Sequence, residues 1–307
     1  MIGSHLAEML AAAGHEILGT YWRPTIDIAE IAHLPLQELD ITDGSSLLSS
    51  LADFRPDGIF HLAAQSYPTV SWQRPIETLQ SNVIGTTMIF EAVRSLKLTP
   101  RIILAGSSAA YGFVAPEEVP VSERRALKPL HPYGVSKAAM EMMAYQYWAN
   151  FKVDAVCVRI FNCTGPRKVG DAASDFVRRA VSLERDGGSS RLLVGNLSTR
   201  RALVDVRDLN RALTLLMQRG TPGEVYNVGG DTAYSMSAIA QLVLANSLRR
   251  DISVEVDPGL LRTIDEAIIW GDTTRVRDAT GWRQDIPIER TIEDMFLYWR
   301  GKDRHGA

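Results

Sequence analysis

Three side chains in the first half of the chain have the types and spacing for proton transfer to a carbonyl oxygen. Ser107 ends the apolar run RIILAGSS, and Tyr133 and Lys137 lie four residues apart in HPYGVSK. On a helix this spacing places both on one face, where an ammonium lowers a phenol pKa and favours proton transfer near neutral pH. A serine at the end of a parallel strand can hydrogen-bond the same oxygen. We therefore predict a catalytic trio of Ser107, Tyr133 and Lys137 acting on a hydroxyl or carbonyl group.

Alternating strand and helix patterns must position these residues. Short apolar runs predict strands at HEILGTY, GIFHLA, RIILAGSS and DAVCVRIF, and runs with helical spacing separate them. This alternation predicts an α/β fold with a doubly wound, Rossmann-like parallel sheet. After Phe161 the chain becomes rich in Gly and Arg and then returns to the first pattern, which predicts a smaller C-terminal α/β lobe. We assign residues 1–163 and 203–230 to the sheet domain and residues 164–202 and 231–307 to the lobe.

Composition narrows the class of protein. The chain has 307 residues, 46% of them hydrophobic, and a formal net charge of −3. This content is ample for a folded core, whereas the charge argues against a general nucleic-acid binder. No apolar run approaches the roughly 20 residues of a transmembrane helix, nothing resembles a signal peptide, and no cluster has metal-ligand spacing. We expect reduced Cys157 and Cys163, a cytoplasmic location, no membrane role and no metal.

Motifs along essentially the whole chain resemble the extended short-chain dehydrogenase/reductase family that acts on nucleotide sugars. They include GSHLAEML, LDITD, RPDGIFHLAAQS, SNVIGT, GSSAAYG, HPYGVSKAAMEM, RIFNCTGPR, EVYNVGG and ATGW. VGNLSTRR and DPGLLR are more particular to the GDP-sugar branch, and the pattern is most like GDP-6-deoxy-4-keto-D-mannose reductases and GDP-mannose 4,6-dehydratases. The resemblance implies a nicotinamide cofactor in the sheet domain and a GDP-sugar in the lobe. It also implies a homodimer through a four-helix bundle of the helices VIGTTMIFEAVRSL and AAMEMMAYQYW, with a buried face within the chain as the alternative.

The resemblance also implies roles for the catalytic trio. Tyr133 would be the proton donor, Lys137 would orient the nicotinamide ribose and assist Tyr133, and Ser107 would bind the 4-keto oxygen. Further residues are implied to line the cofactor: Asp40 and Ile41 near the adenine, and Leu62, Ala63 and Ala64 along its length.

Cationic and amide side chains in the second half are candidates for holding the substrate. The resemblance implies that Arg201 and Arg262 clamp the diphosphate, which guanidinium groups bind bidentately. Asn162, just past a strand end, is expected to bond a phosphate or hydroxyl. Arg178 in SDFVRRAV is a further candidate, with an ordinary helix-surface charge as the alternative. Thr263 departs from the family pattern, because relatives often have proline after the arginine.

Ala109 is the departure that bears on the reaction. Dehydratases of the family carry an acidic residue at this place, which removes a proton from the sugar, and alanine cannot do so. We therefore predict NADPH-dependent reduction of the 4-keto group of a GDP-4-keto-6-deoxy-hexose, as in GDP-D-rhamnose synthesis. The alternatives are a GDP-mannose 4,6-dehydratase, a nucleotide-sugar 4-epimerase and a catalytically silent dinucleotide-binding protein.

Arg23 bears on the choice of cofactor. NAD-preferring Rossmann proteins usually end the second strand with an acid that bonds the ribose, whereas a 2′-phosphate calls for an arginine. The run EILGTYWRPT has no acid at its end and places Arg23 just beyond it. This favours NADP(H), with NAD(H) as the alternative.

Gly3 is expected to belong to the dinucleotide turn. Relatives have an apolar first strand and a G-x-x-G-x-x-G turn, of which the chain as given retains only the last glycine. That first strand is central in a doubly wound sheet, so we expect unpaired strand edges where it would lie. Because losing a central strand costs several kcal/mol at least, we expect Met1 to be an internal methionine of the natural protein.

Overall fold

The computed structural model describes residues 1–186, 189–261 and 266–302. The strands are β1 Gly19–Tyr21, β2 Leu36–Glu38, β3 Gly58–His61, β4 Arg101–Ala105, β5 Ala155–Ile160, β6 Cys163–Thr164, β7 Arg191–Val194, β8 Arg200–Ala202, β9 Val204–Asp205, β10 Val225–Val228, β11 Ala233–Ser235, β12 Ser253–Val256 and β13 Ile268–Ile269. The α-helices are α1 Ile2–Ala12, α2 Gly44–Phe54, α3 Pro68–Gln73, α4 Pro75–Leu79, α5 Gly85–Ser95, α6 Pro132–Phe151, α7 Ala172–Asp186, α8 Val206–Arg219, α9 Met236–Asn246, α10 Thr274–Thr280 and α11 Ile288–Lys302. Short 3₁₀ segments are η1 Ile28–Ile31, η3 Ser108–Ala110, η4 Pro116–Glu118 and η5 Pro258–Leu260, and η2 Gln80–Ile84 is a π-helix.

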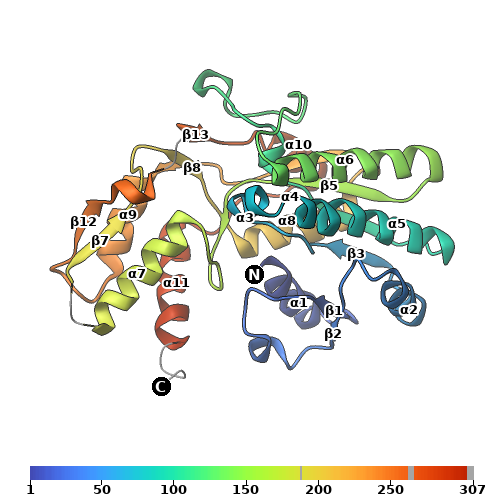
Figure 1. The fold of residues 1–307 in the computed structure, drawn as a ribbon, viewed down its shortest axis with the longest axis horizontal. Helices are drawn as coiled ribbons and strands as arrows, with labels where there is room; N and C mark the ends of the chain where they lie inside the picture. The colour runs from blue at the N-terminus through green and yellow to red at the C-terminus, as the bar shows by residue number, and fades with distance from the viewer. Residues whose placement is uncertain (187–188, 262–265, 303–307) are drawn as a thin grey trace.

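The main sheet contains four parallel strands in the order β10-β5-β4-β3. Side chains of β4 alternate between its faces, as the pleat requires. Ile102 and Leu104 pack with α2, α5 and α6, whereas Ile103 packs with α8. Figure 1 shows these helices on the two faces of the sheet. The predicted doubly wound α/β fold is confirmed.

Strands β1 and β2 form a separate parallel pair. Within the described residues no strand joins this pair to the main sheet, so β1 and β3 each have a ladder on one side only. Figure 1 shows the pair below β3, with α1 beside it. The unpaired strand edges expected from the sequence are therefore present.

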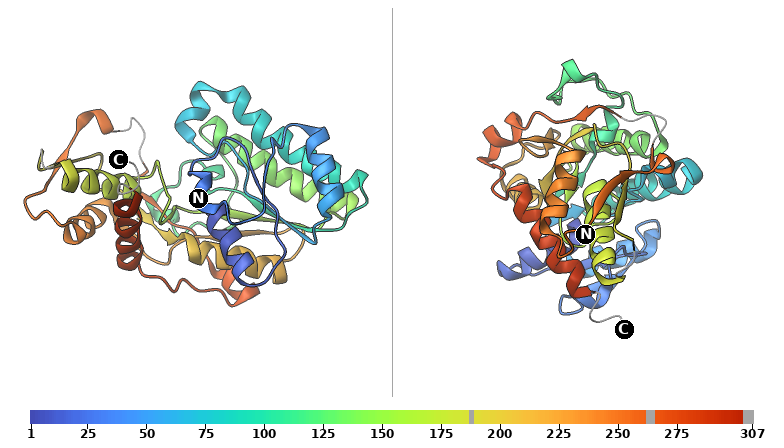
Figure 2. Two further views of the ribbon diagram at one scale, coloured as in Figure 1. Left: turned by 90° about the horizontal axis from the view of Figure 1, so that it is seen from below. Right: turned by 90° about the vertical axis from the view of Figure 1, so that its left-hand side faces the viewer.

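A smaller lobe lies at one end of the molecule (Figure 2). Its core is formed by α7, α9 and α11 together with β7, which pairs with β12. Strand β8 pairs with β11 and β13, and β6 pairs with β9. The domain boundaries given above stay a prediction. Among the described residues, every helix is too short or too polar to cross a membrane.

Candidate active site

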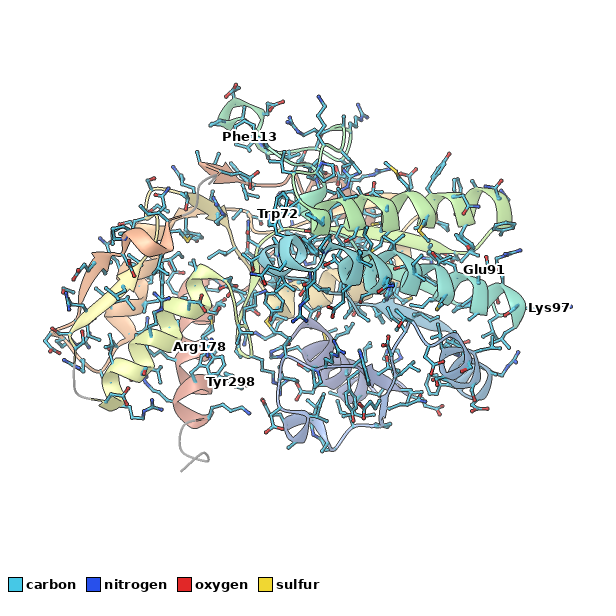
Figure 3. All side chains as sticks on the ribbon, viewed as in Figure 1. Trp72, Glu91, Lys97, Phe113, Arg178 and Tyr298 are labelled. Atoms are coloured by element: carbon cyan, nitrogen blue, oxygen red, sulfur yellow. The ribbon has the colours of Figure 1, made fainter. Side chains whose placement is uncertain are left out.

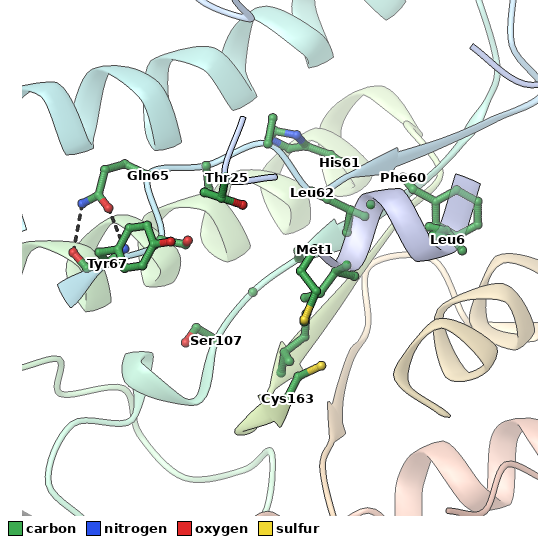
Figure 4. Close-up of a pocket in the computed structure, with 18 of the residues that line it drawn as sticks. Met1, Leu6, Thr25, Phe60, His61, Leu62, Gln65, Tyr67, Ser107 and Cys163 are labelled. Atoms are coloured by element: carbon green, nitrogen blue, oxygen red, sulfur yellow. Dashed lines mark hydrogen bonds between the residues drawn. The ribbon is translucent and has the colours of Figure 1, made fainter. Parts of the chain in front are cut away.

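A cavity of 2340 Å³ runs along the carboxyl ends of β3, β4 and β5 and between β1 and β3. Ser107, Tyr133 and Lys137 all line it. Figure 4 shows Ser107 and Met1 on its wall, with the side chains of β3 and its following loop beside them. The carboxyl edge of a parallel sheet is where ligands of open α/β folds bind.

The predicted catalytic trio is brought together. Ser107 directly follows β4 and caps η3, with its Oγ accepting the Ala109 N–H at 3.2 Å. The Ser107 side chain also lies near enough to the Tyr133 hydroxyl to lower the pKa of that phenol. Lys137 lies one turn further along α6, and its Nζ donates to the Ala105 carbonyl at 2.7 Å. A buried hydroxyl pair therefore lies beside a buried cation on one wall of the cavity.

Burial dominates the electrostatics of this site. It raises the pKa of the Tyr133 phenol, and the nearby Ser107 side chain lowers that pKa by less. Burial also lowers the pKa of the Lys137 ammonium to about 8. The expected lowering of the phenol pKa by Lys137 is not found. The ammonium is bonded to Ala105 and lies 5.9 Å from the centre of the tyrosine ring.

Local sequence explains how α6 presents its tyrosine. His131 caps the helix, with Nδ1 accepting the Gly134 N–H at 3.0 Å, and Pro132 occupies the first turn, where proline costs no hydrogen bond. A Cβ on Gly134 would lie 2.6 Å from the Ala109 carbonyl oxygen. The glycine therefore permits the close approach of α6 to the segment that carries Ser107.

A buried ion pair that the sequence analysis missed supports this arrangement. Arg159 on β5 donates from Nε to Glu141 Oε2 at 2.8 Å and from Nη2 to Oε1 at 2.5 Å. The same guanidinium donates to the Tyr111 hydroxyl at 2.7 Å and to the Glu123 carbonyl. Tyr111 in turn donates to Asn227 on β10 at 2.8 Å. The pair therefore joins α6 to the segment that begins at Ser107.

The π-helix η2 is a second missed feature. It places Asn82 so that Nδ2 donates to the Gln65 carbonyl and to the Ser136 hydroxyl, each at 2.9 Å, while Oδ1 accepts the Gln65 N–H. π-Helical turns often occur at functional sites. Asn82 thus ties the loop after β3 to α6, next to Tyr133 and Lys137. SNVIGT has ordinary helical spacing, so no sequence signal marks the bulge.

The residues predicted to bind the cofactor all line the cavity, namely Gly3, Arg23, Asp40, Ile41, Leu62, Ala63 and Ala64. Arg23 lies in the loop after β1 and is exposed. Its guanidinium donates to Glu77 of α4 at 3.1 Å. Asp40 accepts from the Thr42 N–H and hydroxyl. A Cβ on Gly3 would lie 3.6 Å from Leu62 Cδ1.

Of the described residues predicted to bind the substrate, two line the cavity and one does not. Asn162 and Arg201 line the cavity. Asn162 Nδ2 is buried and has no hydrogen-bond partner in the described part of the chain. Arg178 lies outside the cavity lining, with its guanidinium 5.0 Å from the centre of the Trp299 ring (Figure 3). Arg262 and Thr263 lie outside the described residues. No group of three or more potential metal ligands occurs among the residues that are described.

Known proteins resemble this chain over most of its length. The family model described as GDP-mannose 4,6 dehydratase matches residues 1–295. The chain belongs to the GDP-mannose 4,6 dehydratase family. The relatives of this chain carry more than one named activity.

Two relatives illustrate those activities. GDP-6-deoxy-D-mannose reductase of Pseudomonas aeruginosa is 28% identical, covering 99% of this chain and 95% of that protein. GDP-mannose 4,6-dehydratase of Vibrio cholerae serotype O1 is 26% identical, covering 95% of this chain and 89% of that protein.

Solved structures of similar fold include a complex with NADPH and a complex with NAD. The structure of RMD from Pseudomonas aeruginosa complexed with NADPH has a TM-score of 0.87 at 26% identity and covers 98% of this chain and 96% of that chain. UDP-glucose 4-epimerase from Thermus thermophilus, in complex with NAD, has a TM-score of 0.84 at 25% identity with the same coverage.

Proposed function

We propose that the protein is an NADPH-dependent reductase of the 4-keto group of a GDP-4-keto-6-deoxy-hexose. The observation that carries this proposal is that Ser107, Tyr133 and buried Lys137 line one cavity that is large enough for a dinucleotide and a sugar nucleotide. The reductase from Pseudomonas aeruginosa, similar along its length, supports the same reaction.

The residues of the cavity fit a phosphorylated dinucleotide. The N-terminus of the 11-residue helix α1 lies on the wall, with no acidic residue in its first turn, and helix N-termini favour phosphate groups. Arg23 supports a 2′-phosphate, and we propose NADP(H) as the preferred cofactor, with NAD(H) as the weaker alternative. Bound there, the cofactor would supply a hydride to C4 of the sugar.

In this mechanism Ser107 holds the carbonyl oxygen by a hydrogen bond from Oγ. As C4 accepts the hydride and its electron pair, the oxygen becomes an alkoxide, and the Tyr133 hydroxyl gives it a proton. Lys137, buried and cationic below a pH of about 8, stabilises the phenolate that remains. The product is an alcohol at C4, and a proton from solvent restores Tyr133.

Ala109 favours reduction over dehydration. It lies on the cavity wall directly after the serine pair, and its side chain has no group that can accept a proton. Elimination of water from the sugar requires a base at that place, as family resemblance implies. Reduction requires none, because Tyr133 only donates.

Asn162 and Arg201 are the residues we propose to hold the diphosphate and sugar. The buried Nδ2 of Asn162 carries N–H groups that have no partner in the described part of the chain. The planar guanidinium of Arg201 has a geometry suited to phosphate oxygens. Arg262 stays a prediction. Arg178 is left out of the proposed site, because it packs on Trp299 away from the cavity.

Incubation with NADPH and the GDP-4-keto-6-deoxy sugar tests the proposal. We expect loss of the NADPH absorbance together with a new GDP-6-deoxy-hexose. Dehydration of GDP-mannose without reduction of the keto sugar would assign the chain to the dehydratases. Interconversion of 4-epimers with no net NADPH consumption would assign it to the epimerases. Binding of NADPH without any turnover would leave the silent dinucleotide-binding protein.

We also propose a homodimer through a four-helix bundle that α5 and α6 of two copies form. Large apolar side chains are exposed on α6 and on the adjoining α3 and α4, namely Trp72, Ile76, Val135, Met142 and Tyr145. Figure 3 shows Trp72 on the surface of α3. Sedimentation of the wild type should give twice the chain mass, and Met142→Glu should give a monomer. A monomeric wild type would contradict this proposal.

A further inference from the structure

His131 has one ring nitrogen committed to the backbone and the other left over. Its Nδ1 accepts the Gly134 N–H at 3.0 Å as the cap of α6. A neutral imidazole carries one proton, so the accepting Nδ1 leaves that proton on Nε2. This assignment follows from the hydrogen bond, and it makes Nε2 a donor. Among the described residues, the hydrogen bond found between the ring and the protein is made by Nδ1.

The surroundings of the ring place this donor beside the reacting group. His131 is half-buried and lines the cavity together with Tyr133. The two rings are nearly parallel, with centroids 5.9 Å apart and an angle of 16° between their planes. Burial lowers the pKa of His131 below its ordinary value, so the ring is neutral at pH 7 and keeps both the cap and the donor.

We propose that His131 is a substrate-binding residue whose Nε2–H donates to a sugar oxygen next to the one that Tyr133 protonates. The inference rests on the proposed function, because it needs a sugar at the Tyr133 hydroxyl. A sugar is the fitting ligand at this point. It offers several oxygens within a few ångströms of C4, whereas Arg201 and Asn162 already provide donors for the diphosphate.

His131→Ser separates the two roles of the residue. Serine is a good helix cap and accepts from the same backbone N–H, but it lacks a donor at the distance of Nε2. His131→Ala removes both roles. Ser235→Ala is the matched control, since Ser235 caps α9 by accepting the Ala238 N–H at 3.1 Å and lies outside the cavity lining.

We expect His131→Ser to raise KM for the keto sugar nucleotide about five- to tenfold, which is the loss of one neutral hydrogen bond. KM for NADPH and the melting temperature should stay near those of the wild type. Ser235→Ala should lower the melting temperature without changing either KM. A His131→Ser enzyme with the wild-type KM for the sugar, alongside a weakened His131→Ala, would overturn the proposal and leave His131 as a cap only.

Binding of GDP-mannose, measured by calorimetry, separates this inference from the reaction proposed above. If the wild type binds GDP-mannose but does not reduce the keto sugar, the proposed reaction fails. A five- to tenfold weaker affinity in His131→Ser, again about one neutral hydrogen bond, then still supports the sugar contact. Equal affinities overturn the contact, whereas the proposed reaction is judged only by NADPH consumption with the keto sugar.

Discussion

The two walls of the cavity are built by different means. On the catalytic wall, β4 is hydrogen-bonded on both sides and Ile102, Ile103 and Leu104 are fully buried. On the opposite wall, β1 and β2 have three residues each and are partly exposed, and among the described strands they pair only with one another. Arg167 holds this second wall, with its guanidinium bonded to Glu8 and Glu30.

The two walls are therefore stabilised by different kinds of interaction. The geometry of Ser107 and Tyr133 derives from a continuous sheet and a buried polar network. The dinucleotide side depends on the packing of α1 against α8 and on a few ion pairs. Local stability varies within a structure in this way, and segments with few buried contacts open first. Apart from the change at His61, each change below is directed at one wall and should leave the other largely unaffected.

The largest expected effect is on catalysis. Tyr133→Phe removes the proposed proton donor and keeps the ring, so kcat should fall about 10²- to 10⁴-fold while NADPH affinity changes little. Stopped-flow measurement of NADPH oxidation, with fluorescence titration of NADPH, checks both quantities. Tyr145→Phe, on the exposed face of the same helix, is the control. A Tyr133→Phe enzyme with more than about a tenth of the wild-type kcat would remove Tyr133 from the mechanism.

Breaking the buried pair behind the catalytic wall should cost most in stability. Arg159→Met leaves Glu141, which is only 12% exposed, without its partner, and we expect the free energy of unfolding to fall by about 3–5 kcal/mol. The double variant Arg159→Met, Glu141→Leu should recover much of this loss, because no uncompensated charge remains. Urea unfolding checks the values.

Arg94→Met is the matched control for that loss. It breaks an exposed pair with Glu91, and such pairs contribute less than about 1 kcal/mol. Equal losses in Arg94→Met and Arg159→Met would show that burial does not determine the cost.

The elements that the sequence predicted are those with strong local signals. Apolar periodicity marked the strands and helices around Ser107, and the spacing of Tyr133 and Lys137 marked the site. The Arg159–Glu141 pair could not be predicted in this way, because its partners lie on different elements and only packing brings them together. The bulge at Asn82 has no periodicity of its own. Arg178 and Arg201 look alike as sequence, and only the fold directs one to Trp299 and the other to the cavity.

Loosening the dinucleotide wall should have a local effect. Arg167→Met removes bonds to Glu8 and Glu30, and charge-assisted hydrogen bonds contribute about 1.5–3 kcal/mol. We expect the amides of β1 and β2 to exchange roughly tenfold faster or more, with those of β4 unchanged. Hydrogen exchange read by mass spectrometry distinguishes the two walls. Uniform acceleration across both sheets would show that they open as one unit.

His61 lies at the end of β3, where the two walls meet, and should make stability depend on pH. Burial and the nearby Lys137 cation lower its pKa from 6.5 to about 3. Between pH 6.5 and about 3, His61 is therefore protonated in the unfolded chain and neutral in the folded chain. The free energy of unfolding falls as the pH falls below 6.5. The slope is about 1.4 kcal/mol per pH unit. Urea unfolding between about pH 6.5 and 5 should show a slope smaller by this amount in His61→Gln, and identical slopes would contradict the assignment.

The smallest expected change concerns Arg23, at the outer end of the dinucleotide wall. Its pair with Glu77 is exposed, so Arg23→Ala should alter the free energy of unfolding by less than about 1 kcal/mol. The ratio of kcat/KM for NADPH to that for NADH should nevertheless fall about tenfold or more, because a charged partner of the 2′-phosphate is lost. Arg74→Ala is the control, since Arg74 contacts the same Glu77 carboxylate at 3.4 Å. An equal fall in both variants would show that both arginines contribute to the preference, whereas a fall confined to Arg23→Ala assigns it to the arginine that the sequence places just beyond β1.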